Sequence, residues 1–367
     1  MSKDNELVVK PTTAPRPKPE ADTPLVLGRH FTDHAFSMRW TKRRAWQGLT
    51  IADRNELPAL RPTSAALNYG QTVIEGIKAY RMNDGGIAVY RPDSHVKRLN
   101  NGARRLALPQ LDFDRVWGAL RRLVDLDRDW IPEGPGAALY LRLVLAGNGG
   151  TLDLAPADEC LFYALAGPVG SAAEQGDRSA RSMVVDGYAT AWPGGTGSVR
   201  AAGNYGPNVV PGEIAANYGY DQVLWLDAEH QRFVKQLGTM NVFFVIDGVL
   251  TTPPLDPGIL PGVTRDSVIK LARDAGVTVD ERPVELAEVL KGIDDGRVTE
   301  CFGTATETGI TAVCEIGHKG QEHRIPGSTP GPVTARYRDL LDGLHRGDAP
   351  DRFGWMRRLT EVSPVHA

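Results

Sequence analysis

The chain of 367 residues has little net charge, few cysteines and no long apolar run. Its 42 Lys+Arg residues nearly balance 45 Asp+Glu, so the net charge of −3 offers no broad basic field for nucleic acid or an anionic membrane. No stretch reaches the roughly 18 apolar residues that span a bilayer, and the N-terminus lacks the apolar core of a signal peptide. Three cysteines without CxxC spacing favour neither a disulfide framework nor a zinc site. We therefore expect a cytoplasmic protein without a metal, a nucleic-acid partner or a membrane partner.

The composition is that of a folded protein, with 41% apolar and 24% charged residues, and the length suggests two domains. Loops and turns must be frequent, because the chain has 40 glycines and 26 prolines. Composition and pattern predict the following organisation: a mobile proline-rich tail over residues 1–24, an α/β domain over 25–169, a polar linker over 170–181 and a second α/β domain over 182–367.

Local patterns predict several elements of these domains. Apolar residues recur at helical spacing in three segments, and two apolar runs have the length of buried strands. The Asp-Gly pair at 247–248 is typical of a two-residue hairpin. The predicted helices are 94–106, 112–127 and 265–275, and the predicted strands include 138–146, 160–166, 222–227 and 242–246.

Several loop motifs follow one another along both halves of the chain. They are Asn68-Tyr69-Gly70-Gln71, Glu75-Gly76, Arg91-Pro92-Asp93, Arg98-Leu99, Tyr140-Leu141-Arg142, Gly203-Asn204-Tyr205-Gly206-Pro207, Gly238-Thr239-Met240-Asn241, Leu260-Pro261-Gly262-Val263-Thr264-Arg265 and Glu300-Cys301-Phe302-Gly303. In this order they resemble the branched-chain amino acid aminotransferases, which are class IV (fold type IV) pyridoxal-phosphate enzymes. The resemblance covers roughly residues 25 to 345. It implies a smaller N-terminal α/β domain, a larger C-terminal α/β barrel-like domain, a cofactor cleft between them and a homodimer.

The resemblance also implies roles for single residues. Val263 and Thr264 are expected to begin a helix, and the backbone N–H groups of a helix N-terminus attract a phosphate. This expectation follows from the residues as well as from the resemblance. Arg98 matches the family's phosphate arginine and Thr306 its phosphate or carboxylate threonine, although on pattern alone Arg98 would be a solvated helix residue. Tyr205 matches the tyrosine that donates to the cofactor's phenolic oxygen. The substrate-side positions are Tyr69, Tyr140, Arg142, Gln236, Thr304 and Ala305.

Three residues depart from the family pattern. Arg200 stands where the family has the lysine that bonds the cofactor, and a guanidinium is neither a nucleophile nor a base near neutral pH. Gln236 stands where the family has the glutamate that pairs with the pyridine nitrogen. Glu307 replaces a small residue, and it is either an acid in the cleft or an acid on a surface loop. Lys235 and Lys78 are poor substitutes, because strand alternation turns Lys235 away from Gln236 and Lys78 lies in a strand pattern.

These departures lead to the hypothesis of a repurposed aminotransferase fold. It would act on a small anionic keto acid or amino-acid-derived substrate by acid/base chemistry of isomerase, cyclase or lyase type, with Glu307, Arg200 and Tyr205 as catalytic residues. No pyridoxal phosphate would be covalently bound, and any binding would be non-covalent. Two other functions stay open: a branched-chain amino acid aminotransferase, and a non-catalytic binding or regulatory protein.

Overall fold

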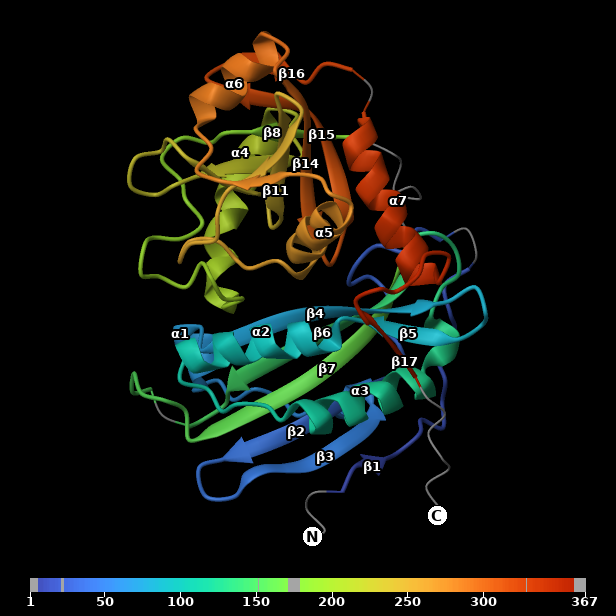
Figure 1. Cartoon of the computed structure of the whole chain (residues 1–367). Helices are drawn as coiled ribbons and strands as arrows, with labels where there is room; N and C mark the ends of the chain where they lie inside the picture. Colours follow the sequence, from blue (N-terminus) through green and yellow to red (C-terminus); the bar gives the residue numbers. More distant parts are fainter. Residues whose placement is uncertain (1–5, 21–22, 151, 171–178, 328, 360–367) are drawn as a thin grey trace. The chain divides into compact units, whose positions relative to one another are not determined.

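The computed structural model describes residues 6–20, 23–150, 152–170, 179–327 and 329–359 (Figure 1). These residues form two compact units. The first unit contains the described residues up to 170, the short segment Arg200–Gly203 and the described residues from Asp342 onward. The second unit contains the described residues of 179–199 and those of Asn204–Leu341. Both combine helices with a sheet, so the predicted α/β class is confirmed.

The first unit is built on an eight-stranded sheet in the order β1-β3-β2-β7-β6-β4-β5-β17. Among the described residues, its strand pairs are antiparallel except β1 with β3. Its strands are β1 Val8–Val9, β2 His34–Thr41, β3 Ala45–Asp53, β4 Thr72–Arg81, β5 Ile87–Tyr90, β6 Ala138–Gly147, β7 Glu159–Val169 and β17 Met356–Arg358. Its helices include η2 Arg54–Glu56, α1 Ala65–Tyr69, α2 Pro92–Arg105, α3 Phe113–Leu126 and η3 Arg128–Trp130.

Helices α2 and α3 pack on this sheet (Figure 1). Helix α3 starts where Asp112 accepts a hydrogen bond from the backbone N–H of Arg115, an N-cap that satisfies one of the helix's unpaired donors. Its buried stripe includes Leu120 and Leu123, which join Phe36 and other sheet residues in one hydrophobic core. The two helices predicted over 94–106 and 112–127 are therefore confirmed, and so are the strands predicted over 138–146 and 160–166.

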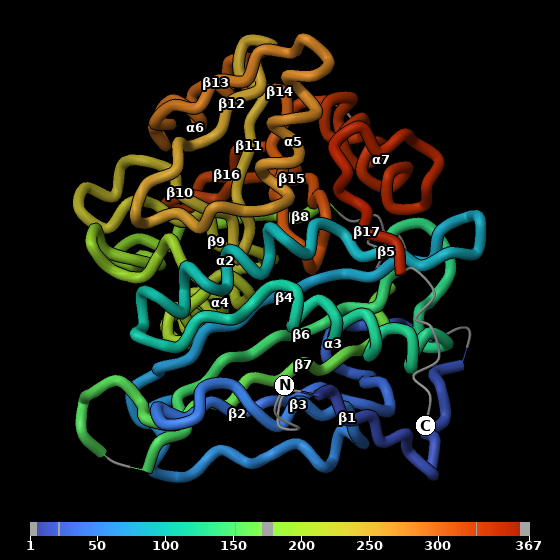
Figure 2. The backbone as a smooth tube through the Cα atoms, turned by 60° about the horizontal axis from the view of Figure 1, so that its bottom comes forward, coloured from blue at the N-terminus to red at the C-terminus, as the bar shows by residue number. Residues whose placement is uncertain are grey.

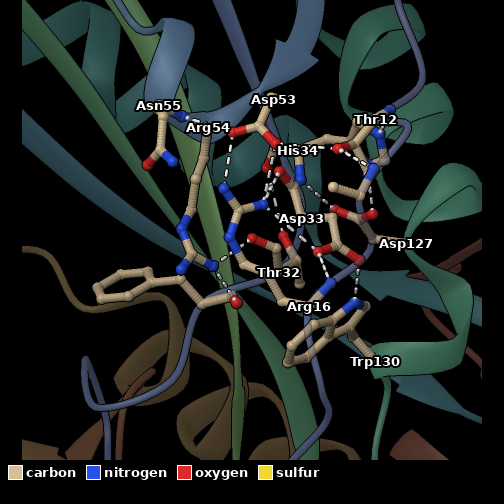
Figure 3. A network of polar contacts seen from close by, with 12 residues as sticks. Thr12, Arg16, Thr32, Asp33, His34, Asp53, Arg54, Asn55, Asp127 and Trp130 are labelled. Atoms are coloured by element: carbon tan, nitrogen blue, oxygen red, sulfur yellow. Dashed lines mark hydrogen bonds and ion pairs between the residues drawn. The ribbon is translucent and has the colours of Figure 1, made fainter.

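The N-terminal segment, predicted to be a mobile tail, contributes a strand to the sheet and a polar network beside it (Figure 3). Arg16 donates to Asp53 at 2.7 and 3.1 Å, and its backbone N–H donates to Asp33 at 2.8 Å. The backbone N–H of Thr12 donates to Nε2 of His34 at 2.8 Å. These partners lie far from the segment in the sequence, so local composition could not reveal them.

The end of the chain also returns to the first unit. Strand β17 pairs with β5 (Figure 2), and His345 stacks on Tyr80 with ring centroids 4.1 Å apart. The sequence predicts a single domain over 182–367, but the structure assigns the described residues from Asp342 onward to the first unit because of this pairing and stacking. The predicted linker 170–181 lies mostly outside the described residues.

The second unit is built on a curled nine-stranded sheet with the order β10-β9-β8-β15-β14-β11-β12-β13, with β16 paired to β15 (Figure 1). Its strands are β8 Ala180–Met183, β9 Gln222–Leu226, β10 Val234–Leu237, β11 Asn241–Ile246, β12 Val249–Thr252, β13 Val279–Glu281, β14 Val298–Ala305, β15 Gly309–His318 and β16 Gln321–Arg324. The remaining helices among the described residues are η4 Ala202–Asn204, η5 Gly206–Asn208, α4 Val209–Asn217, α5 Val263–Asp274, α6 Leu286–Asp294 and α7 Pro332–Arg346.

The predicted hairpin at Asp247-Gly248 joins β11 to β12, and both residues have positive φ angles of 50° and 76°, as a two-residue hairpin turn of this twist requires. Helix α5 confirms the helix predicted over 265–275, beginning two residues earlier. None of the helices among the described residues is both long and apolar enough to cross a membrane.

Candidate functional site

In the first unit the candidate site is a buried ionic cluster centred on Glu75 of β4. The Glu75 carboxylate accepts hydrogen bonds from Nε and Nη2 of Arg98 at 2.8 and 2.7 Å. Arg200 approaches the same carboxylate with Nη1 at 3.4 Å, and Nδ1 of His95 lies 3.3 Å from it. The backbone N–H of Gly76 is a further donor at 2.8 Å. A carboxylate that is fully excluded from water thus gains the charged partners that make its burial tolerable.

Secondary structure brings these side chains together. Arg98 and His95 lie three residues apart on α2, so one face of this helix presents both toward β4. Arg200 belongs to a short segment that runs beside β4, where Ala201 forms a bridge with Val73 and the carbonyl of Arg200 accepts from the N–H of Ile74. Arg98 and Arg200, two predicted site residues, therefore both contact the carboxylate of Glu75, a motif residue for which the sequence predicts no role.

The charges in this cluster shift its titrations. Burial opposes ionisation of Glu75, but the charge and hydrogen bonds of Arg98, with the contact from His95, hold its pKa well below the ordinary value. Burial lowers the pKa of His95 and outweighs the contact with Glu75, and the charges of Arg98 and Arg200 act in the same direction as burial. The cluster therefore contains an ionised Glu75 and a neutral His95.

Two further predicted residues lie on the same sheet, and a third is more exposed. Tyr140 is buried on β6, and its hydroxyl occupies the space where a side chain at position 76 would begin, so only glycine fits there. The guanidinium of Arg142 lies 5.3 Å from the centre of the Tyr140 ring. Tyr69, at the end of α1, is 45% exposed, and its hydroxyl donates to the carbonyl of Leu152.

In the second unit, Tyr205 and Gln236 line one small hollow of about 30 Å³. The amide of Gln236 donates to the Thr190 hydroxyl at 3.3 Å and to the Gly258 carbonyl at 3.4 Å. Lys235 does not line this hollow, and its amine forms an ion pair with Asp256 at 2.5 Å. The other lining residues are Gly197, Val199, Asn204, Asn208, Gly238, Thr239 and Leu260.

Helix α5 begins beside strand β11. Gly262 precedes the helix without a side-chain cap, and Asn241 lies so close to it that a side chain at position 262 would not fit. Val263 and Thr264 form the buried first turn, where backbone N–H groups point out of the helix end. Such a helix end favours an anion, as the sequence predicts.

Strand β14 carries the remaining predicted residues. Thr304 pairs with Asn241 of β11, and its hydroxyl is buried without a hydrogen-bond partner among the described residues. Ala305 ends the strand, and Thr306 and Glu307 form the half-buried turn that leads into β15. Glu307 thus lies neither in the interior nor fully in solvent.

Three polar residues of these sites have no role predicted from the sequence, although two of them, Glu75 and Asn241, belong to the quoted motifs. Glu75 and His95 hold the cluster of the first unit, and Asn241 lies between Gly262 and Thr304 in the second. The signals were present, since an acidic residue interrupts an apolar strand at Glu75 and a polar residue begins a buried strand at Asn241. Neither position reveals its partner without the fold.

A cavity of about 510 Å³ elsewhere in the first unit contains none of the predicted site residues. Its lining includes Lys18, Pro24, Trp130 and Pro168. Cavity volume alone therefore does not locate the candidate functional site. The predicted site residues lie instead at the buried polar groups described above.

Comparison with known proteins gives consistent matches along the chain. The family model "Amino-transferase class IV" matches residues 72–316. The chain is 38% identical to the branched-chain-amino-acid aminotransferase of Mycobacterium tuberculosis, covering 90% of this chain and 91% of the relative. It is 35% identical to branched-chain-amino-acid aminotransferase 2 of Bacillus subtilis, covering 97% of both chains. The solved branched-chain amino acid aminotransferase of Escherichia coli is 25% identical with a TM-score of 0.72, over 88% of this chain and 99% of that one.

These relatives contradict two hypotheses drawn from Arg200, Gln236 and Glu307. The main functional hypothesis, a repurposed enzyme working without the covalent cofactor, is wrong because relatives along nearly the whole chain are aminotransferases. The expectation that no pyridoxal phosphate is covalently bound is wrong for the same reason, since the matching structures include cofactor-bound aminotransferases. Three side chains carry less weight than similarity along the whole chain.

The matched fold agrees with the observed α/β units and the curled second sheet. The predicted fold type IV architecture is therefore confirmed. Since the family model covers most of the chain and the curated relatives exceed one third identity over nine tenths of it, this chain belongs to the class IV aminotransferases, in the branched-chain amino acid aminotransferase family.

Proposed function

We propose that this protein is a pyridoxal-phosphate-dependent aminotransferase that moves the amino group between a branched-chain amino acid and a 2-keto acid. The observation that carries the proposal is the similarity to branched-chain aminotransferases at 35–38% identity over 90% or more of the chain. Several polar groups of the two units are consistent with it.

The second unit offers groups that fit a phosphate monoester. The first turn of α5, at Val263 and Thr264, supplies backbone N–H groups, and the buried Thr304 hydroxyl has no partner among the described residues. Both features suit an anion whose oxygens accept several hydrogen bonds. Thr306, on the turn after β14, would add a hydroxyl. When bound, the cofactor supplies an electron sink for reactions at the carbon that bears the amino group.

Other residues fit the ring and the substrate. The Tyr205 hydroxyl would donate to the phenolic oxygen, and the Gln236 amide would face the ring nitrogen. In the first unit Arg98 would bind an anionic group of the cofactor, and Tyr140 and Arg142 would orient the substrate. Tyr69 of the first unit and Ala305 of the second would be further substrate-side residues. Glu307 would hold or move a proton, and Arg200 would attract a carboxylate; both roles remain predictions.

The test is reconstitution followed by amino transfer. The purified chain should bind pyridoxal phosphate, develop visible absorption and transfer the amino group of leucine, isoleucine or valine to 2-oxoglutarate. Transfer from these three donors should exceed transfer from aspartate. If the protein takes up no cofactor, or transfers no amino group from any branched-chain donor, the proposal is overturned.

The same preparation locates the bond to the cofactor. Borohydride reduction should attach the bound pyridoxal phosphate permanently to the chain. Peptide mapping of this cofactor-labelled protein then identifies the lysine that carries it, which is not residue 200 because Arg200 has no primary amine. Reconstituted protein without reduction is the control. A protein that transfers amino groups but yields no labelled peptide would contradict covalent attachment and leave the reaction itself supported.

We also propose a homodimer acting on small amino-acid substrates. Four exposed apolar side chains of the first unit support an interface, and a hydrogen bond from the Tyr69 hydroxyl to the Leu152 carbonyl brings two of these residues together: Leu67 (62%), Tyr69 (45%), Leu152 (60%) and Leu154 (85%). Light scattering should give twice the chain mass of 39.8 kDa. A mass equal to one chain at micromolar concentration would contradict the dimer without touching the reaction.

A further inference from the structure

We propose that Glu75 is a positioning residue: it fixes the guanidinium of Arg98, and with it Arg200, so that the anion-binding strength of the protein depends on a carboxylate that never contacts the anion. The inference rests on the proposed function, which gives Arg98 an anionic group of the cofactor to bind.

The contact geometry carries the first step. Both oxygens of Glu75 bind one edge of Arg98, with Nε donating to Oε2 and Nη2 donating to Oε1. Two parallel hydrogen bonds of this kind fix the plane of a guanidinium as well as its position. Glu75 therefore contributes directly to the direction in which the rest of the Arg98 guanidinium points.

The second step is the crowding around Oε1. This one atom lies within 3.4 Å of four donors: Nη2 of Arg98, Nη1 of Arg200, Nδ1 of His95 and the N–H of Gly76. Two guanidinium groups thus approach the same oxygen in a site where Glu75 and His95 are fully buried and both arginines nearly so. At this separation and in these surroundings like charges repel strongly unless a negative charge lies between them.

A neutral residue at position 75 would remove that charge. Arg98 and Arg200 would then face each other across an amide, and repulsion would move at least one guanidinium out of its present orientation. An anion that needs an oriented fork of N–H donors would lose affinity, because preorganisation is lost before binding. The extra positive potential would not compensate, since its source would no longer point at the ligand.

His95 supports the same arrangement. Its ring places Nδ1 toward Oε1 of Glu75, and its Nε2 is buried without a hydrogen-bond partner among the described residues. A neutral ring with Nδ1 protonated donates to the carboxylate without adding a third positive charge. His95 therefore helps to hold Glu75 in place while leaving the charge balance of the cluster unchanged.

The experiment compares one ligand with the phosphate and one without it. Tryptophan fluorescence titration gives the dissociation constants of the full chain for pyridoxal phosphate and for pyridoxal. Because free pyridoxal closes to a hemiacetal in every sample alike, the change of their ratio between a variant and the wild type measures the change in the phosphate's contribution. In the wild type the ratio should favour pyridoxal phosphate strongly. In Glu75→Gln we expect this preference to fall at least tenfold, mainly through weaker binding of pyridoxal phosphate.

Glu315→Gln is the matched control. Glu315 is a buried carboxylate of the second unit that accepts from Nε and Nη2 of Arg181 at 3.0 and 2.6 Å and lies 3.3 Å from Arg324. Glu315→Gln should lose stability as Glu75→Gln does, but it should keep the wild-type preference for pyridoxal phosphate over pyridoxal. A similar loss in both variants would mean that Glu75 is merely structural, and the inference would be overturned.

Glu75→Asp provides a second route if the amide variant does not fold. Aspartate keeps the negative charge, but its side chain is shorter by one methylene group. Its carboxylate therefore cannot accept hydrogen bonds from both Nε and Nη2 of Arg98 in their present positions. We expect at least a threefold fall in the preference. An unchanged or increased preference in either folded variant would overturn the inference, whereas a wild type that binds neither ligand would instead overturn the proposed function.

Discussion

Thr334 donates two hydrogen bonds to one oxygen of Glu300, from its backbone N–H at 2.8 Å and from its hydroxyl at 2.7 Å. The other oxygen accepts the N–H of Val333 at 2.9 Å. A buried carboxylate of β14 therefore caps the first turn of α7, where a negative charge also meets the positive end of the helix dipole. Gly331 and Pro332, where the helix begins, offer no side-chain acceptor that could do this instead.

The substitution Glu300→Gln should lower the free energy of unfolding by about 2 kcal/mol. The amide nitrogen would face one of the two backbone N–H groups, donor against donor, and the favourable charge would be lost. Urea unfolding followed by circular dichroism measures the change. Glu285→Gln is the control, because that carboxylate and its partner Arg232 are solvent-exposed and should contribute less than about 1 kcal/mol. Equal effects of the two variants would contradict the capping role.

Thr304→Val should stabilise the protein without ligand and weaken its binding of pyridoxal phosphate. The Thr304 hydroxyl is buried without a partner among the described residues, so replacing it by a methyl group removes an unsatisfied group and should raise the free energy of unfolding by about 1 kcal/mol. The measurements are urea unfolding without ligand and a pyridoxal phosphate titration.

Thr251→Val is the matched control for that prediction. Thr251 is equally buried, but its hydroxyl donates to the Val249 carbonyl at 3.3 Å. Its replacement should therefore lower stability and leave cofactor affinity unchanged. If Thr304→Val is also destabilising, the hydroxyl has a partner in solution and the argument for an open phosphate group fails.

Stability should depend on pH through His345. Its ring stacks on Tyr80, and burial, with a smaller contribution from the charge of Lys78, lowers its pKa from 6.5 to about 3. Between these two values the unfolded chain binds a proton that the folded chain does not bind. Its contribution to stability is therefore complete above pH 6.5 and is lost as the pH falls toward 3, by at most about 1.4 kcal/mol per pH unit.

The variant His345→Phe isolates this contribution. It keeps an aromatic ring beside Tyr80 but cannot titrate, so its unfolding free energy should fall less steeply between about pH 6.5 and 4 than that of the wild type. His230→Gln, which removes an exposed imidazole, should follow the wild type. Identical slopes in the wild type and His345→Phe would show that the ring is not buried in its neutral form.

Arg16→Ala should release the N-terminal segment (Figure 3). Arg16 joins this segment to Asp53 and Asp33, so its removal should speed amide exchange at Lys10 and Thr12, whose N–H groups bond to Ile51 and His34. Hydrogen exchange with mass spectrometry measures the effect. Lys18→Ala in the same segment is the control, because its ion pair with Asp129 is long and exposed. Similar exchange in both variants would assign the attachment to β1 alone.

Local signals in the sequence predict most elements whose caps, apolar stripes or turn residues lie within the element itself or next to it. Helix α3 has its cap at Asp112 and its stripe within a single run, and the β11–β12 turn has its Asp247-Gly248 pair. Strand β17 and the N-terminal strand β1 have no such signal, since each is two or three residues long and depends on a distant partner. Pairing with a partner 42 residues away, as for Val8 and Thr50, or 266 residues away, as for Tyr90 and Met356, leaves no local period to detect.

The candidate site was predictable to a similar degree. The motifs predict site roles for Arg98, Thr264 and Tyr205. They do not predict that Glu75 binds Arg98, because Glu75 lies in a strand whose other residues are mostly buried and apolar patterning does not reveal a polar partner. The incorrect hypothesis of a repurposed enzyme without covalent pyridoxal phosphate also has a physical explanation. A side chain shows which group is missing at one position, as Arg200 does, but it does not show which chemistry the rest of the chain retains.

The order in which the chain enters its two units constrains its biosynthesis. The sheet of the first unit ends with β17, which pairs Met356 with Tyr90, so its edge strand leaves the ribosome only after the whole second unit. The N-terminal half must therefore wait through most of translation with β5 unpaired on one side, exposed to chaperones and to other nascent chains. Loss of the segment that contains β17 would thus damage the unit that is synthesised first.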